Sequence, residues 1–509
     1  YFGFGAGTCV ASLSDGALTV GAPGTTADYV LVGASTGIGV LTVSGGLLNH
    51  SNINRTISVN NSGDARGELN LLGGVIDNSG GGVSYGYNTG TGDGTGIVNL
   101  NRGNLLLNRF INKKQSGHSG TTGDPYLNFN GGTLTASPST LTTPNLSFSS
   151  DFLPVLTAVY VNGPFGAFAG GAVIDTAGQN CIVDAALLAP TGSGVSGLAV
   201  ADGGSGYIGA PYVSITGDGT GATAIANMIP DGSGALKVGS ITVCNPGVNY
   251  TRAATSFSFI GGAPDTPATP GDLTVAGNTS GGLTKNGAGT LTLAGANTYT
   301  GPTRVNGGTL IVDGVVAAGS AVSVSGGALS GTGLIRGPVT VHVGGTLAPG
   351  GTSLGSLSVS NTLTLQAGST TFIRVNAADG SCDLVRGITT ASYGGTLVIS
   401  NTAGTLAPGQ SFQLFSARSY SQTFSNIQPA EGETTWNFNP ATGTVSVMAT
   451  TPTNLCCALS GGTLTLTWPG SHLGWHLQSN AVSLLNPDTW YNIPGSQFAT
   501  NLSITLSPV

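Results

Sequence analysis

The sequence predicts an all-β protein built as a stacked coil, or β-solenoid, and three observations favour this fold. Short alternating runs typical of strands, such as LTL at 291–293 and TLIV at 309–312, are separated by Gly, Asn and Pro at positions that must turn. A small or polar residue, two glycines, any residue and then Leu or Ile recur from residue 44 to residue 464, as a repeated corner would. Charged residues make up 7%, against roughly 25% in ordinary soluble domains.

The first third of the chain contains a repeat of nearly constant length. The equivalent positions Thr42, Asn70, Asn99 and Asn128 fall 28, 29 and 29 residues apart. Such an interval is that of one solenoid coil per repeat. We therefore expect Asn70, Asn99 and Asn128 to form a structural ladder, in which each side-chain amide donates to the next along the axis.

Composition divides the chain into five parts. Tyr207 and Tyr250, each at the start of a matching β-rich segment, lie 43 residues apart and indicate a duplicated unit. Pro264, Pro267 and Pro270 then predict a stiff connection. The predicted parts are an N-terminal solenoid with coils of about 29 residues (1–150), further solenoid strands (151–202), a duplicated Gly-Tyr insert (203–263), a second solenoid stretch (264–450) and a Trp-rich, sandwich-like β-domain (451–509).

The segment LTKNGAGTLTLAGANTYTGPTRVNGGTLIVDG at 283–314 closely resembles the autotransporter-associated β-strand repeat of large exported bacterial proteins. LNFNGGTLTAS, GGSGYIGAPYVSITGDGTGATAIANM and LTLTWPGSHLGWHLQ are similar to parts of multi-repeat surface proteins of the Verrucomicrobia type. The resemblance implies an exported passenger folded as a right-handed parallel β-helix. These repeats are scaffolds without family-wide catalytic residues, so the resemblance implies no enzyme activity.

Charge and cysteine content argue against several classes of partner and cofactor. The net charge of -7 includes no acidic or basic run, and no apolar segment approaches the ~20 residues of a membrane helix, so we expect neither nucleic-acid binding nor membrane insertion. Six cysteines without zinc spacing predict no metal centre. Asp64, Asp93 and Asp124 recur near the asparagines. We expect these aspartates to form turns, with a calcium ladder as the alternative. The expected cofactor is therefore none, with calcium as the exception to test.

Catalytic constellations are sparse in this sequence. Glu68, Glu431 and Glu433 are its three glutamates, and acidic residues seldom come close together, although stacked coils could gather distant ones. His472 and His476 flank a glycine in a β context, unlike a helical metal pair. The prediction is a non-enzyme, with a β-helix polysaccharide-degrading enzyme as the second alternative.

The favoured function is an extracellular structural protein of the bacterial cell surface or matrix, whose rods self-assemble end to end into fibres. Tyr1, Phe2 and Phe4 form an aromatic start that could complete a neighbour's sheet, or could be an ordinary first strand. The first alternative is an adhesin or glycan-binding protein. Its candidate contacts are aromatic residues that could instead pack against their own sheets: Tyr207, Tyr250, Trp475 and Trp490.

Overall fold

The computed structural model describes residues 2, 6–20, 30–50, 56–60, 64–85, 94–112, 124–137, 151–432, 434–449, 453–480, 482 and 489–506. In this part of the chain the elements are strands and short 3-10 turns, η1 (Gly470–His472) and η3 (Ser496–Phe498), without an α-helix. None of the described segments forms a helix with the length and apolarity needed to cross a membrane. The predicted all-β solenoid is confirmed, since parallel strands stack in about 13 turns.

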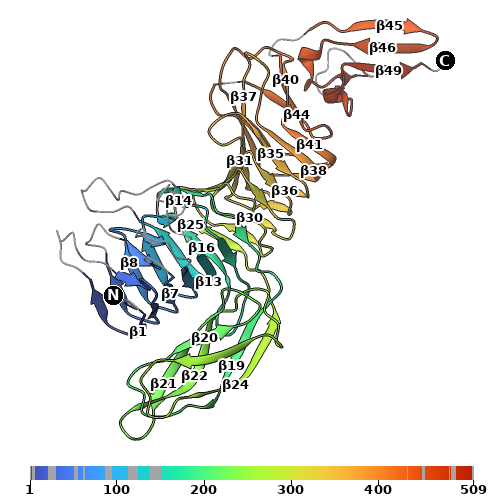
Figure 1. Ribbon diagram of the computed structural model, residues 1–509. Helices are drawn as coiled ribbons and strands as arrows, with labels where there is room; N and C mark the ends of the chain where they lie inside the picture. Colours follow the sequence, from blue (N-terminus) through green and yellow to red (C-terminus); the bar gives the residue numbers. More distant parts are fainter. Residues whose placement is uncertain are drawn as a thin grey trace. The chain divides into compact units, whose positions relative to one another are not determined.

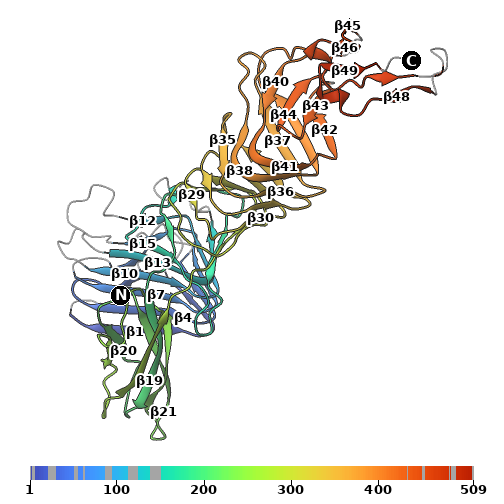
Figure 2. The ribbon, with the colours of Figure 1, turned by 90° about the vertical axis from the view of Figure 1, so that its right-hand side faces the viewer.

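The chain forms two compact units, Tyr1–Val322 and Ser323–Val509. In the first unit, parallel strands lie one above another in successive turns (Figure 2). One face consists of β1 (Thr8–Leu13), β4 (Ile38–Val43), β7 (Arg66–Leu71), β10 (Thr95–Leu100), β13 (Asp124–Ala136), β15 (Ala158–Val161) and β18 (Leu187–Leu188). The next face consists of β2 (Ala17–Thr19), β5 (Leu47–Asn49), β8 (Val75–Asn78), β11 (Asn104–Leu107), β16 (Gly171–Asp175), β25 (Leu283–Asn286) and β27 (Thr303–Val305). The short strand β29 (Val315–Val316) is not part of this face and bridges Ala296 in parallel.

Two further parallel sheets close the turns of this unit. The N-terminal turns use β3 (Val30–Val32), β6 (Ile57–Val59), β9 (Val83–Tyr85) and β12 (Phe110–Asn112). The later turns use β14 (Asp151–Leu153), β17 (Asn180–Val183), β26 (Thr290–Leu293) and β28 (Thr309–Val312).

The second unit continues the same architecture and then changes to antiparallel pairing. Its parallel strands are β30 (Val322–Val324), β31 (Ala328–Gly331), β32 (Leu334–Ile335), β33 (Val339–Val341), β34 (Thr346–Pro349), β35 (Ser356–Val359), β36 (Leu363–Leu365), β37 (Thr370–Val375), β38 (Leu384–Tyr393), β39 (Thr396–Asn401), β41 (Phe415–Gln422) and β42 (Asn426–Pro429). Three small antiparallel sheets follow: β40 (Ser411–Gln413) with β44 (Thr444–Val447) and β43 (Trp436–Asn439); β45 (Cys456–Ser460) with β46 (Thr463–Thr467) and β49 (Asn501–Thr505); and β47 (Gln478–Ser479) with β48 (Tyr491–Asn492).

Alternating side chains build the core of the solenoid. In β7 and β10, Leu69, Leu71, Val98 and Leu100 point inward and are at most 1% exposed. Burying each such side chain contributes about 1.5–3 kcal/mol. Because neighbouring turns pair in register, these residues form continuous apolar columns inside the coil.

The repeated glycines mark a corner that a larger residue could not occupy. Gly46, Gly74 and Gly103 follow one another along the axis with φ of 68°, 67° and 73°. A Cβ atom on Gly74 would also lie 2.5 Å from the carbonyl oxygen of Gly46 in the turn beneath. Both the backbone conformation and the close approach of turns therefore require glycine here.

The insert is larger than the predicted 203–263. It consists of β19 (Ser193–Asp202), β20 (Tyr212–Thr216), β21 (Thr223–Pro230), β22 (Leu236–Asn245), β23 (Ser256–Ile260) and β24 (Thr269–Gly277), and Figure 1 draws it in green to yellow. β19 and β24 pair antiparallel and lead out of and back into the solenoid. Pro270 lies opposite Val200 in this pair, so the proline-rich stretch predicted as a connection belongs to the insert's own sheet. An edge strand accepts proline because one row of its backbone groups makes no ladder bonds.

The predicted solenoid of 264–450 ends earlier than expected. β40, β44 and β43 form an antiparallel sheet, where the sequence predicted further coils. The rings of Tyr393, Phe415, Phe424 and Phe438 pack there with centroids 5.0–6.3 Å apart. Aromatic contacts of this kind close an open apolar end and shield its strand edges.

Candidate functional site

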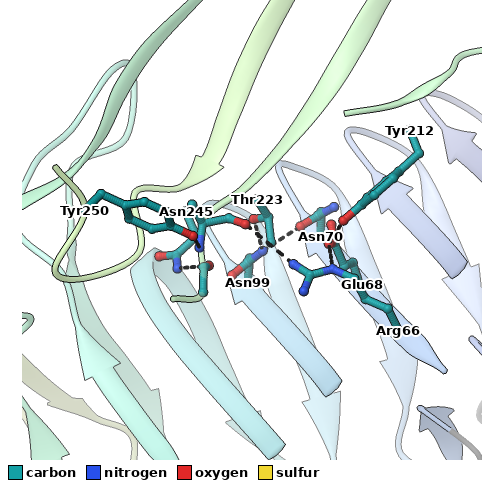
Figure 3. Close-up of polar contacts among 10 residues, drawn as sticks. Arg66, Glu68, Asn70, Asn99, Tyr212, Thr223, Asn245 and Tyr250 are labelled. Carbon is teal, nitrogen blue, oxygen red and sulfur yellow. Dashed lines mark hydrogen bonds and ion pairs between the residues drawn. The ribbon is translucent and has the colours of Figure 1, made fainter. Parts of the chain in front are cut away.

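One outward face of the N-terminal turns is buried. Glu68, Asn70 and Asn99 alternate with the inward leucines of β7 and β10, so they point away from the solenoid core, yet each is 0% exposed. The insert folds back over this face, as the contacts in Figure 3 show. We call this face, formed by the outward residues of β4, β7, β10 and β13, the seat of the insert.

An asparagine column runs along the seat. The side-chain nitrogen of Asn99 donates to Oδ1 of Asn70 at 2.7 Å, and that of Asn128 donates to Oδ1 of Asn99 at 2.8 Å. The three residues are directly opposite one another in the parallel register. Asn99 also donates to Oγ1 of Thr223 in the insert at 2.9 Å (Figure 3). The column therefore joins successive turns to one another and to the insert.

A second group of asparagines, which the sequence analysis missed, binds another edge of the insert. Asn101 and Asn130 both donate to the backbone carbonyl of Cys244, at 2.7 and 3.1 Å. Asn162 donates to Asn130 at 2.7 Å and to Asn245 of the insert at 3.0 Å. The sequence did contain a signal, because Asn101 and Asn130 follow Asn99 and Asn128 by two residues. Residues two apart in a strand lie on the same face of the sheet.

A charged pair lies at the other edge of the seat. Arg66 Nε donates to Glu68 Oε1 at 2.6 Å, and the Tyr212 hydroxyl of the insert donates to the same oxygen at 3.1 Å (Figure 3). Burial, followed by the charge of Glu68, raises the pKa of Tyr212 far above its usual value. Tyr212 therefore stays protonated and donates to the carboxylate. A buried carboxylate without these donors would be strongly destabilising.

The seat combines the buried apolar residues Val40 and Ile97 with the buried polar groups described above, and the polar groups set its chemistry. A hydrogen bond that replaces one to water contributes only about 0.5–1.5 kcal/mol, whereas a buried partner left unpaired costs about 1–3 kcal/mol. The asparagines and Glu68 thus fix one position of the insert, because a displaced insert would leave them unpaired. The arrangement positions a domain; it contains no nucleophile paired with a base.

We expect Asn99→Ala to lower the free energy of unfolding by about 2 kcal/mol, because it leaves Asn70, Asn128 and Thr223 without their shared partner. Urea unfolding would measure this. The matched control is Asn306→Ala: Asn306 makes a comparable 3.0 Å bond to Asn286, but on an exposed surface, and should cost below about 0.5 kcal/mol. Equal losses in the two variants would contradict the assigned role of the seat.

The stretch that resembles the exported repeat contains a buried lysine. Lys285 is 0% exposed, and its Nζ donates to Thr176 Oγ1 and to the carbonyls of Asn286, Gly287 and Gly307 at 2.8–3.0 Å. Thr176 follows β16, and Gly307 follows β27, so the ammonium group joins three successive turns. Burial lowers the pKa of Lys285. The lysine is a structural element of the coil.

Comparison with known proteins agrees with this geometry. The model of the passenger-associated-transport-repeat family matches residues 283–312, which form β25 to β28 of the solenoid. The chain thus contains the autotransporter-associated repeat that its sequence predicted, and this repeat lies within the solenoid. No curated protein matches the sequence. The narrower likeness to Verrucomicrobia surface proteins stays a prediction.

Two of the aromatic residues predicted as glycan contacts of this repeat protein are buried. Tyr207 and Tyr250 are 1% and 5% exposed. Their hydroxyl oxygens accept backbone N–H groups of Ala268 at 2.8 Å and Ala222 at 3.4 Å. This burial argues against the predicted glycan role of both residues, because the rings are closed to a ligand and the hydroxyls are bonded within the insert.

The predicted tryptophan contacts lie near the C-terminal sheets. Trp475 is half-buried, its Nε1 donates to the carbonyl of Ala449 at 3.0 Å, and its ring packs 5.4 Å from His472. Trp490 is half-buried beside Tyr491, which is 67% exposed. These tryptophans belong to the second unit, whereas the insert tyrosines belong to the first.

The predicted assembly segment is partly described. Phe2 donates its backbone N–H to Leu31 and accepts from Gly33, both at 2.8 Å, and so pairs with the strand next to it in its own chain. This pairing within the chain is that of an ordinary first strand, and the completion of a neighbour's sheet stays a prediction. Tyr1 and Phe4 lie outside the described residues.

The described residues contain no group of three or more His, Cys, Asp or Glu side chains able to hold a metal ion. Of the aspartates considered for a calcium ladder, Asp93 lies outside the described part of the chain. Asp124 begins β13, and its carboxylate accepts a bond from the hydroxyl of Thr157, 33 residues further along the chain, at 3.3 Å.

Proposed function

We propose that this repeat protein is an extracellular structural protein of the bacterial cell surface or matrix. The coarser statement, a passenger-like β-solenoid surface protein, follows from the repeat match on a solenoid. The single observation that carries the proposal is that residues of the matched repeat itself hold the turns of the coil together. Lys285 and the buried leucines of β26 and β28 join and fill turns.

The exposed faces support a scaffold role. Thr290 donates to Asn180 at 2.9 Å and Asn306 donates to Asn286 at 3.0 Å, each across neighbouring turns. Such uncharged side-chain ladders continue the backbone ladder on the outside of the coil. The polar seat then holds the insert at a fixed place along the scaffold.

The location can be tested with an epitope tag in the turn between β21 and β22. Gly232 and Gly234 lie in this turn with open space around them, so an insertion should not disturb the fold. We expect an external antibody to label intact cells of the producing bacterium. If the antibody labelled the tag only after the cells were lysed, as an antibody against a cytoplasmic marker would, the proposal would be overturned.

Self-association into larger assemblies remains part of the proposal, and electron microscopy of the purified chain tests it. We expect linked copies; isolated single particles at all concentrations would count against it.

The adhesin alternative now depends on Trp475, Trp490 and the exposed Tyr491, and a glycan array with Tyr491→Ala as the control would test it.

A further inference from the structure

The C-terminal segment is almost free of charge. Residues 451–509 contain one charged side chain, Asp488, and no Lys or Arg. Charged side chains on edge strands are a common device by which proteins prevent edge-to-edge pairing. Two copies of this segment would meet without appreciable electrostatic repulsion.

Strand β45 is an unprotected edge of its sheet. In the described residues it pairs on one side, with β46, and all five of its residues are exposed. Its sequence, Cys-Cys-Ala-Leu-Ser, has no charged residue and no proline, and its register with β46 is regular. An exposed, regular and uncharged edge offers unpaired backbone N–H and C=O groups to another strand.

One face of this sheet is apolar. Cys457 lies opposite Leu466, Leu459 opposite Leu464, and Leu464 opposite Ile504. Leu459 is 66% exposed and Ile504 is 37% exposed. The other face carries Thr, Ser and Asn on β46 and β49, and Cys456, Ala458 and Ser460 on β45. The sheet thus has one apolar and one polar face, and the apolar face continues to the free edge.

We propose that β45 pairs antiparallel with β45 of a second copy of this chain, about a two-fold axis at Ala458. Directly opposed residues in an antiparallel pair lie on the same face. With the axis at Ala458, Cys457 opposes Leu459 of the second copy, so the apolar faces join across a six-stranded sheet. A shift by one residue would join the apolar face of one copy to the opposite face of the other.

The geometry favours a second copy over an unrelated strand. A two-fold contact requires a self-complementary patch, and this five-residue strand overlaps fully with itself only when centred on Ala458. The inference rests on the proposed self-association, to which it gives a surface. In this register, Cys456 opposes Ser460, so the native cysteines of the two copies do not meet.

The purified chain provides the test, in a background with Cys9, Cys382 and Cys456 replaced by serine and Cys457 replaced by alanine, so that residue 457 stays apolar. Ala458→Cys should form a disulfide-linked dimer under mild oxidation, because the two introduced thiols face each other at the axis. Ser460→Cys is the matched control and should stay monomeric on a non-reducing gel, because it opposes residue 456. Equal cross-linking of both variants, or of neither, would overturn the register.

A second variant tests the association itself. Leu459→Lys adds a charge to the apolar face and should weaken dimer formation by about tenfold or more in sedimentation, with the circular dichroism unchanged. A monomeric wild-type chain at every concentration, or dimers unaffected by Leu459→Lys, would refute the proposal. These measurements do not depend on location, so a failed surface-labelling experiment leaves them decisive.

Discussion

Raising the pH from about 8 to about 11 should lower the free energy of unfolding by about 1.4 kcal/mol for each of four buried tyrosines, or roughly 5.6 kcal/mol in all. Burial raises the pKa of Tyr299 to about 12 and the pKa values of Tyr85, Tyr212 and Tyr393 further still. Above pH 10 the unfolded chain loses these protons while the folded chain keeps them. The folded state therefore binds more protons, and stability falls as the pH rises.

Urea unfolding at several pH values, read together with tyrosinate absorbance, would measure this effect. Lys285, whose pKa is lowered, works in the opposite direction, but only below its ordinary value of about 10.5. Tyr85→Phe should reduce the alkaline loss by about 1.4 kcal/mol, because one of the titrating groups is gone. A stability that stays level or rises between about pH 10 and 11 would contradict the burial of these hydroxyls.

Lys285→Ala should destabilise the chain by about 3 kcal/mol. The change leaves the hydroxyl of Thr176 and the carbonyls of Asn286, Gly287 and Gly307 without their common donor, and it opens a cavity where the aliphatic stem was. Both costs fall near the start of the matched repeat, where the lysine joins three turns.

Two control variants separate the causes of that loss. Lys285→Met keeps most of the volume and should recover about 1 kcal/mol, which isolates the lost hydrogen bonds. Lys237→Ala, on the insert surface, should change the unfolding free energy by less than about 0.5 kcal/mol. If Lys285→Ala were as mild as Lys237→Ala, the ammonium group would have no structural role.

The solenoid could be predicted because its signal is local and repeated. The interval between Asn70, Asn99 and Asn128 is the length of one turn, so the sequence alone places them side by side. The corner glycines repeat for the same reason, since each turn meets the same steric limit as the turn beneath.

The seat of the insert could not be predicted because its contacts join distant segments. Thr223 meets Asn99 across 124 residues, and Tyr212 meets Glu68 across 144. Nothing in the alternation of β7 distinguishes an outward Glu68 in water from one covered by another domain. Glutamate is rarely fully buried unless it is paired, so there was no reason in the sequence to expect a buried Glu68. Only the fold supplies its partners.

The antiparallel sheet of β40, β44 and β43 was wrongly predicted as further solenoid coils, for a different reason. The alternation of polar and apolar residues at 411–415 and 436–439 has period two, and this period is the same in parallel and antiparallel strands. Pairing direction depends on the connections, which the alternation does not encode. The aromatic residues of this region were the available sign that the coil closes there.

The central claim is that each turn of the chain stacks directly on the turn before it, and a spin-label distance tests it within the first unit. Ala17 and Arg304 are both exposed and belong to one in-register column, seven strand spacings apart. With labels on cysteines at these two positions, the exposed native cysteines being replaced by serine, pulsed electron paramagnetic resonance should give a single distribution centred at about 34 Å. A distribution centred below about 25 Å or above about 45 Å, or one without a defined centre, would contradict the stacking that every other inference requires.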